Sequence, residues 1–205
     1  MLLNIIFFVA LAADAMTAAL AAGRRKMDWL GVCLLACITA LGGGTLRDTF
    51  LGHYPLSWVA NPWLLALCCG AALATIAFAR FVEYLRWPFL LLDGLGLVAF
   101  TIIGCNVAIE MGQSPAIVIV AGMVTGCAGG VLRDVLCNDV PLLFSGELYA
   151  TVSIVTGAIY WTGLHFGLPV DLVIVGAFLV GFPLRVAAIL FKITMPKFVY
   201  DKELR

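Results

Sequence analysis

Apolar residues run in seven long blocks along the chain, separated by short polar breaks. Each block approaches the roughly 20 helical residues that cross a bilayer core about 30 Å thick. A membrane barrel needs strands of about ten residues in which apolar and polar positions alternate, and these blocks do not alternate. The pattern therefore predicts an all-α integral membrane protein with seven spans, at Leu2–Ala22, Trp29–Phe50, Asn61–Ala79, Pro88–Ile109, Pro115–Leu136, Glu147–Phe166 and Val170–Phe191.

Composition agrees with a protein that has little mass outside the membrane. Of the 205 residues, 63% are hydrophobic and 12% charged, and the formal net charge is zero; the mean hydropathy is +1.10. Soluble domains carry about 25% charged residues, so a soluble enzyme is disfavoured. Disorder requires the opposite composition. Nucleic acid is not an expected partner, because binding its phosphates requires a basic surface.

The distribution of basic residues predicts the orientation. The loops after the first and third spans, together with the C-terminal tail, contain Arg24, Arg25, Lys26, Arg80, Arg86, Lys192, Lys197, Lys202 and Arg205. The loops after the second, fourth and sixth spans contain none, with Arg47 counted inside its helix. Positive charge marks the cytoplasmic side. We therefore expect an inner-membrane protein with the C-terminus in the cytoplasm and the N-terminus outside.

The chain contains an internal repeat. Shifted by 86 residues, the segment from Thr39 to Asp48 aligns with the segment from Thr125 to Asp134, and both contain Gly-Gly followed by Leu-Arg-Asp. The first copy lies in spans one to three and the second in spans four to six. Because three spans are an odd number, the second copy is inverted relative to the first. We expect three regions: residues 1–86, residues 87–168, and a seventh helix with a cytoplasmic tail over 169–205.

Glycines are concentrated in spans two and five. Small residues spaced by four allow two helices to approach closely, which explains part of the pattern. Consecutive glycines cost a helix about 1 kcal/mol each relative to alanine and favour a kink or a break. Interrupted helices at membrane depth are typical of ion and substrate sites. The candidate pore residues are therefore Gly42, Gly43, Gly44, Gly129 and Gly130.

Six ionisable residues lie within the predicted spans: Asp14, Arg47, Asp48, Asp93, Arg133 and Asp134. A charge at the bilayer centre costs about 2.5–3.5 kcal/mol on insertion scales. Ion pairs that lock the two repeats together are one explanation. The six groups still carry an excess of two acids, which favours a polar path for cations with the arginines as gates or latches. Asp14 and Asp93 are a possible matched pair.

Other reactive residues give no second site. The seven cysteines lie in or beside the spans without the further ligands that would complete a metal shell, and are interpreted as packing residues; neither a metal nor a cofactor is expected. His53 and His165 are interpreted as interfacial. Arg185 is placed close enough to the end of span seven to reach the membrane surface as an anchor.

The two glycine motifs, the Ala22–Asp28 turn and Leu92–Gly96 together resemble the bacterial members of the trimeric intracellular cation (TRIC) channel family, whose members are also known under a glycine transporter domain name. The likeness covers roughly residues 2 to 195. It implies seven spans, a homotrimer, and a separate pore in each protomer, lined by kinked second and fifth spans. Animal members pass potassium and bind a phosphoinositide through a Lys-Glu-Val motif. That motif is absent here, so the lipid role is not expected.

Two classes of function remain open on the sequence. The first is a channel that passes monovalent cations, with potassium as the expected ion. The second is a secondary transporter of a small solute such as glycine, because inverted repeats with interrupted helices occur in transporters too. An intramembrane hydrolase requires a nucleophile beside a base; the nearest pair, His53 and Ser57, falls in a predicted external loop. We therefore do not expect an enzyme.

Overall fold

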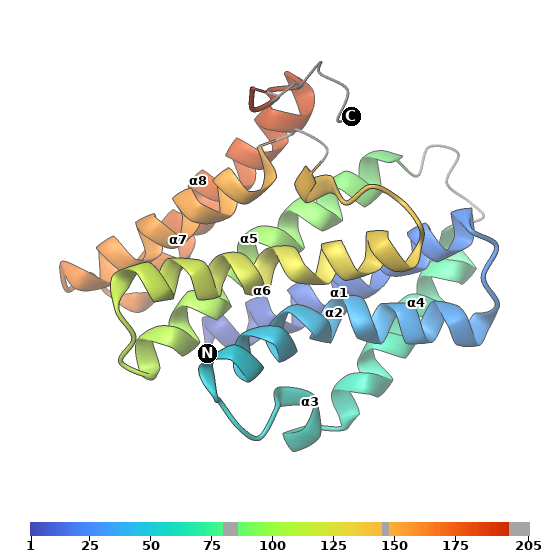
Figure 1. The fold of residues 1–205 in the computed structure, drawn as a ribbon, viewed down its shortest axis with the longest axis horizontal. Helices are drawn as coiled ribbons and strands as arrows, with labels where there is room; N and C mark the ends of the chain where they lie inside the picture. Colours follow the sequence, from blue (N-terminus) through green and yellow to red (C-terminus); the bar gives the residue numbers. More distant parts are fainter. Residues whose placement is uncertain (80–85, 145–147, 197–205) are drawn as a thin grey trace, which may run out of the picture.

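The computed structural model describes residues 1–79, 86–144 and 148–196, and this part of the chain is helical (Figure 1). The long helices are α1 (Leu2–Arg24), α2 (Trp29–Leu51), α4 (Trp63–Ala79), α5 (Arg86–Glu110), α6 (Pro115–Leu136), α7 (Tyr149–His165) and α8 (Val170–Leu190). Two short elements, α3 (Ser57–Ala60) and the 3-10 turn η1 (Leu142–Phe144), connect them.

The helix bounds follow the predicted apolar blocks closely. The bounds of α6 are the predicted ones, and α5 begins two residues earlier than expected, at Arg86. Glu147, the expected first residue of the sixth block, lies outside the described residues. Within the described residues five helices, α1, α2, α5, α6 and α8, are long and apolar enough to cross a membrane, whereas α4 and α7 have 17 residues each. The chain is therefore an all-α protein with several membrane-spanning helices.

Local signals explain where the central helices start and stop. The side chain of Asp28 caps α2 by accepting a hydrogen bond from the Gly31 N–H at 2.7 Å, which satisfies a free helix donor. Gly52 ends α2 with φ of 69°, a left-handed conformation that glycine adopts without strain. Pro115 occupies the first turn of α6, where its missing N–H costs nothing.

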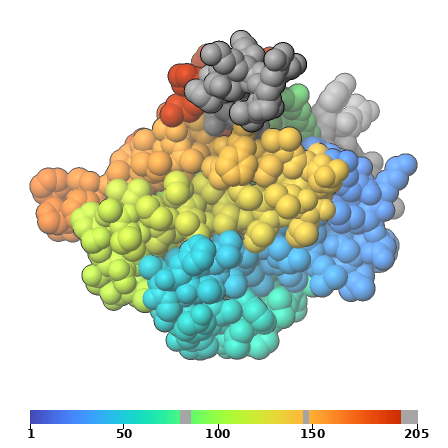
Figure 2. Space-filling model, viewed as in Figure 1, coloured from blue at the N-terminus to red at the C-terminus, as the bar shows by residue number. Residues whose placement is uncertain are grey.

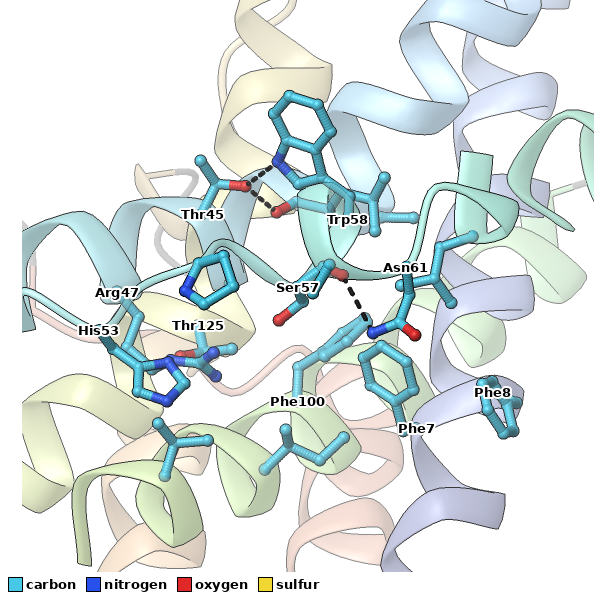
Figure 3. Close-up of a pocket in the computed structure, with 18 of the residues that line it drawn as sticks. Phe7, Phe8, Thr45, Arg47, His53, Ser57, Trp58, Asn61, Phe100 and Thr125 are labelled. Atoms are coloured by element: carbon cyan, nitrogen blue, oxygen red, sulfur yellow. Dashed lines mark hydrogen bonds between the residues drawn. The ribbon is translucent and has the colours of Figure 1, made fainter. Parts of the chain in front are cut away.

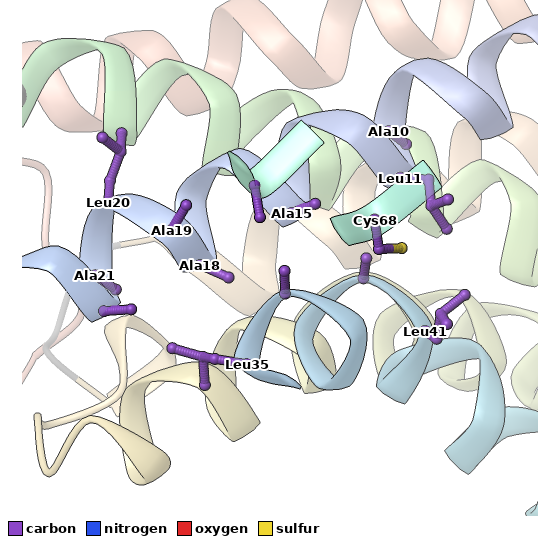
Figure 4. Packing of buried hydrophobic residues seen from close by; sticks show 14 of the residues in the cluster. Ala10, Leu11, Ala15, Ala18, Ala19, Leu20, Ala21, Leu35, Leu41 and Cys68 are labelled. Carbon is purple, nitrogen blue, oxygen red and sulfur yellow. The ribbon is translucent and has the colours of Figure 1, made fainter. Parts of the chain in front are cut away.

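The helices pack in two overlapping groups that share α5. In the first group α1 contacts α2, α4 and α5, and in the second α5 contacts α6, α7 and α8. The long contact of α2 with α6 joins the groups, and Figure 2 shows the blue and cyan surface of the N-terminal helices beside the yellow surface of α6. Small side chains on α1, such as Ala15 and Ala18, let α2 and α4 pack closely against it (Figure 4).

The glycine-rich segments do not break their helices. Both α2 and α6 remain α-helical through Gly42–Gly44 and Gly129–Gly130. A break at these positions is therefore absent, and the expected kink stays a prediction. The reason lies in the partner helix: close packing against a neighbour holds each segment helical despite the low intrinsic helix preference of glycine.

Candidate functional site

All six predicted intramembrane charges are buried, and each is at most 7% exposed. The structure separates them into two clusters and one acid outside them. Each cluster is built on one copy of the Arg-Asp motif, near opposite ends of the bundle.

The cluster on α6 is centred on Arg133. Its guanidinium donates a hydrogen bond to Asp93 on α5 at 2.8 Å, another to the neighbouring Asp134 at 2.8 Å, and a third to the Thr17 hydroxyl on α1 at 3.0 Å. The same guanidinium lies 4.7 Å from the ring centre of Phe89. Arg133 therefore links three helices through one side chain. Both of these ion pairs lie within residues 87–168, and the hydrogen bond to Thr17 is the contact that crosses to the first repeat, so this cluster does not form the expected ion pair between the repeats.

The cluster on α2 is more local. Arg47 donates two hydrogen bonds to the adjacent Asp48, at 2.7 and 2.9 Å. A ring nitrogen of His53, just beyond the end of α2, lies 3.1 Å from the same Asp48 oxygen. Asp48 and His53 come from the same short stretch of chain, so this cluster ties the end of α2 to the following loop and does not join the two repeats.

Asp14 forms no ion pair with either cluster, although it lies within electrostatic range of Asp93 and Arg133 in the α6 cluster. Its carboxylate lies in the space left by two glycines, Gly96 on α5 and Gly129 on α6. Among the described residues no basic side chain forms an ion pair with it. Asp14 and Asp93 therefore have different surroundings, although each lies on the first helix of its three-helix region.

The repeated motifs contact one another reciprocally where α2 crosses α6. A Cβ atom placed on Gly43 would overlap the backbone carbonyl of Thr125, and one placed on Gly129 would overlap the backbone carbonyl of Thr39. Gly43 and Gly129 are equivalent positions of the repeat, as are Thr39 and Thr125. Such an exchange of equivalent contacts is typical of a two-fold axis.

Two cavities approach this crossing from opposite ends. The larger, about 490 Å³, lies between α1, α2, α3, α4 and α5 and is lined by Gly44, Arg47, His53, Trp58 and Thr125, among others (Figure 3). Trp58 closes one of its sides by donating a hydrogen bond from its indole to the Thr45 hydroxyl at 3.2 Å. The smaller, about 360 Å³, lies at the Arg24 end of α1 and is lined by Arg24, Phe89, Asp134 and Asp139.

Phe89 stands between the smaller cavity and the α6 cluster. It lines that cavity, and its ring is 4.9 Å from the guanidinium carbon of Arg24 and 4.7 Å from that of Arg133. Cations above an aromatic face are attracted to its negative potential. The ring therefore packs against one arginine that borders the cavity and another that is buried.

The prediction that Arg185 is a surface anchor is wrong. Instead of reaching the membrane surface as an anchor, it is fully buried, with its guanidinium 4.7 Å from the ring centre of Tyr149. The reason is the rotation of α8, which turns this face toward α5, where Gly94 lies against the Arg185 side chain. Arg185 thereby reduces the buried acid excess from two to one.

Four residues that contact the buried charges or lie beside them were not identified as site residues from the sequence: Thr17, Phe89, Tyr149 and Arg185. Thr17 and Phe89 carried a weak signal, since they lie one helical turn from Asp14 and Asp93 and residues three or four apart share a helix face. Tyr149 had no such signal, because its place depends on how α7 packs. Within residues 1–79, 86–144 and 148–196 no group of three or more His, Cys, Asp or Glu side chains is arranged so that it could hold a metal ion.

The fold and the site define a helical membrane protein with buried ion pairs between two opposed cavities. The glycine transporter family model matches residues 4–80 and 90–165. The inner membrane protein YadS of Escherichia coli is 35% identical over 196 residues, which cover 95% of each chain. The solved TRIC channel orthologue from Rhodobacter sphaeroides is 33% identical, with a TM-score of 0.90 over 94% of this chain and 99% of that one.

A second solved structure, of a TRIC cation channel, is 31% identical with a TM-score of 0.87 and covers 98% of each chain. The chain belongs to this glycine transporter family, which includes the prokaryotic TRIC channels.

Proposed function

We propose that the protein is a channel that passes monovalent cations, with potassium as the main ion, through a path inside each protomer. The observation that supports this most is the position of the α2–α6 crossing between two opposed cavities. The similar solved structures are TRIC cation channels. The path runs from the larger cavity past Gly43 and Gly129 to Phe89 and the smaller cavity, and is closed at the crossing in the arrangement described above.

The proposed architecture is two inverted three-helix repeats, residues 1–86 and 87–168, followed by a seventh helix. The exchanged contacts between Gly43 and Thr125 and between Gly129 and Thr39 support the inversion. All seven long helices then cross the membrane, α4 and α7 included. The ion pair of Arg25 with Asp139 joins the ends of α1 and α6, and the positive-inside rule assigns that end to the cytoplasm.

The buried charges give the path its preference for cations. The acids exceed the arginines even when Arg185 is included, and charge in a low-dielectric pore acts strongly on a passing ion. In this proposal Asp14, beside the crossing, attracts the ion, while the Arg133–Asp93 pair is a latch that holds α5 and α6 together. Arg47, which lines the larger cavity, and its partner Asp48 border the outer entrance.

Purified protein in planar bilayers tests the proposal directly. We expect unitary potassium currents with a clear preference for cations over anions. The alternative is a secondary transporter of a small solute such as glycine, which the two cavities separated by a closed crossing also suit. Saturable glycine uptake into liposomes, without unitary currents, would replace the channel with this alternative.

Neutralising Asp14 is expected to reduce the cation current several-fold. In the Asp14→Asn variant the carboxamide occupies nearly the same space beside Gly96 and Gly129 but carries no charge. The measurement is single-channel conductance and the potassium-to-chloride permeability ratio. Asp171→Asn, in the exposed first turn of α8, is the matched control and should leave both values unchanged. Equal conductance in all three proteins would remove Asp14 from the ion path.

The proposed homotrimer is tested separately. One of the similar solved structures is described as a trimeric channel, and the protein is expected to assemble with two further copies in a lipid membrane. Light scattering in mild detergent, corrected for bound detergent and lipid, should give three times the mass of the 21.9 kDa chain. A monomer or dimer under conditions that preserve unitary currents would contradict the trimer.

A further inference from the structure

Four of the seven cysteines gather where α2 packs against α4, outside the proposed path. Cys33 and Cys37 lie one turn apart on α2, and Cys68 and Cys69 are consecutive on α4. The sulfur atoms of Cys37 and Cys69 are 3.8 Å apart. The Cys37 thiol also interacts with Cys68, and Cys69 interacts with Cys33. This group of four thiols is called the thiol cluster below.

Packing alone does not account for the thiol cluster. A cysteine in a helix interface fills a space similar to that of alanine or serine, yet here side chains from two helices place sulfur against sulfur. Cys37 also donates a thiol hydrogen bond to the Leu65 carbonyl on α4, at 3.8 Å. The contacts of this thiol with Leu65, Cys68 and Cys69 are therefore all made with α4.

We propose that Cys37 and Cys69 are the site of a reversible disulfide bond that ties α2 to α4. A disulfide requires a sulfur–sulfur distance of about 2.05 Å, so the two thiols must approach by roughly 2 Å through side-chain rotation and a small shift of the helices. In the reaction two S–H bonds break and one S–S bond forms. The two protons and two electrons pass to a membrane-permeant oxidant of the quinone or azo class, which becomes the hydroquinone or the hydrazine.

Distance and exposure together select this pair within the thiol cluster: Cys33 is partly exposed too, but the sulfur–sulfur distance of 3.8 Å joins Cys37 to Cys69. Cys37 and Cys69 are each partly exposed, whereas Cys68 is fully buried beneath the alanine-rich face of α1 (Figure 4). A reagent dissolved in the membrane therefore reaches Cys37 and Cys69 before Cys68. Susceptibility of thiols to oxidation follows such access.

The bond would restrain the helix that carries the proposed outer half of the path. α2 contains Gly42–Gly44, Arg47 and Asp48, whereas α4 packs on its opposite side, away from α6. A covalent tie to α4 holds α2 in its present position against α6 and so keeps the crossing closed. This effect rests on the proposed channel function; the formation of the bond does not.

Thiol counting tests the bond. The full chain in liposomes is treated with diamide, denatured, and labelled with N-ethylmaleimide, and the labels are counted by intact mass. We expect the untreated protein to carry seven labels and the treated one five, with dithiothreitol restoring seven. Peptide mapping should link Cys37 to Cys69. Cys33→Ser, one turn away on the same helix, should form the same bond, whereas Cys37→Ser and Cys69→Ser should not form it.

Seven labels after diamide, or an equal loss of labels in the Cys69→Ser variant, would overturn the proposed site. Current recordings test the effect on α2: diamide should reduce the open probability of the wild-type channel several-fold, reversibly, and leave the Cys69→Ser channel unaffected. A bond that forms without changing the current would overturn the restraint on α2 alone. Absence of any current in untreated protein would overturn the channel proposal and leave the bond standing.

Discussion

Replacing Arg133 with alanine is expected to destabilise the protein more than any other single change at the site. Arg133 holds Asp93 on α5, Asp134 on α6 and Thr17 on α1, and it is only 1% exposed. Removing one partner of a buried pair leaves an uncompensated charge, which costs about 3–5 kcal/mol. The variant should unfold at a markedly lower temperature in detergent, or should fail to accumulate in the membrane as folded protein.

Arg47→Ala is the matched control for Arg133→Ala. Arg47 is the equivalent residue of the first copy, but within the described part of the chain its side-chain hydrogen bonds go to the adjacent Asp48 alone, and it borders the larger cavity. Water in that cavity can solvate Asp48 after the change, and His53 remains beside it. The loss of stability should therefore be clearly smaller than for Arg133→Ala. Equal losses would mean that the cross-helix bonds of Arg133 contribute little.

Alanine at Gly43 or Gly129 is expected to disrupt the α2–α6 crossing. The added methyl group would overlap a backbone carbonyl of the facing helix, and backbone cannot rotate away as a side chain can. Forcing extra atoms into a packed interface costs about 1–3 kcal/mol. Each variant should therefore lose thermal stability, and the double variant should lose less than the sum of the two losses, because both methyl groups act on the same crossing. The same proteins should show altered potassium currents in bilayers, because the proposed path is closed at this crossing.

Glycines with open surroundings provide the control. A Cβ atom at Gly70 on α4 or at Gly176 on α8 would meet nothing within 4 Å. Alanine is favoured over glycine in a helix by about 1 kcal/mol, so Gly70→Ala and Gly176→Ala should be neutral or slightly stabilising. If all four alanine variants behave alike, close approach is not the function of Gly43 and Gly129.

The sequence predicted the helices because it contains their physical cause. A block of apolar residues bounded by Asp28 and Gly52, or by Pro115, sets where a helix begins and ends. The repeat also revealed the glycines and the Arg-Asp pairs as special, since glycines are unfavourable in helices and buried charges are costly. Their involvement in ion passage stays a prediction.

The sequence could not predict what each charged residue contacts. Apolar blocks this uniform do not reveal the rotation of a helix about its axis, and rotation alone decides whether Arg185 meets water or Tyr149. It also decides that Arg133 reaches Asp93 while Arg47, among the residues that the structure describes, reaches no acid on another helix. For the same reason the continuity of α2 through Gly42–Gly44 could not be read from the chain, because it depends on what packs against those glycines.

The exchanged contacts at the crossing have a mechanical consequence. As the chain advances from Thr39 to Gly43 it meets Gly129 and then Thr125, so the two helices run antiparallel in fixed register. Sliding α2 along α6 would move both carbonyls away from the glycines that they face at the same time. The two contacts therefore fix the register of α2 on α6 together, and neither can be released without the other. Movement of α2 must lift or tilt it away from α6, as one event that both halves of the protein share.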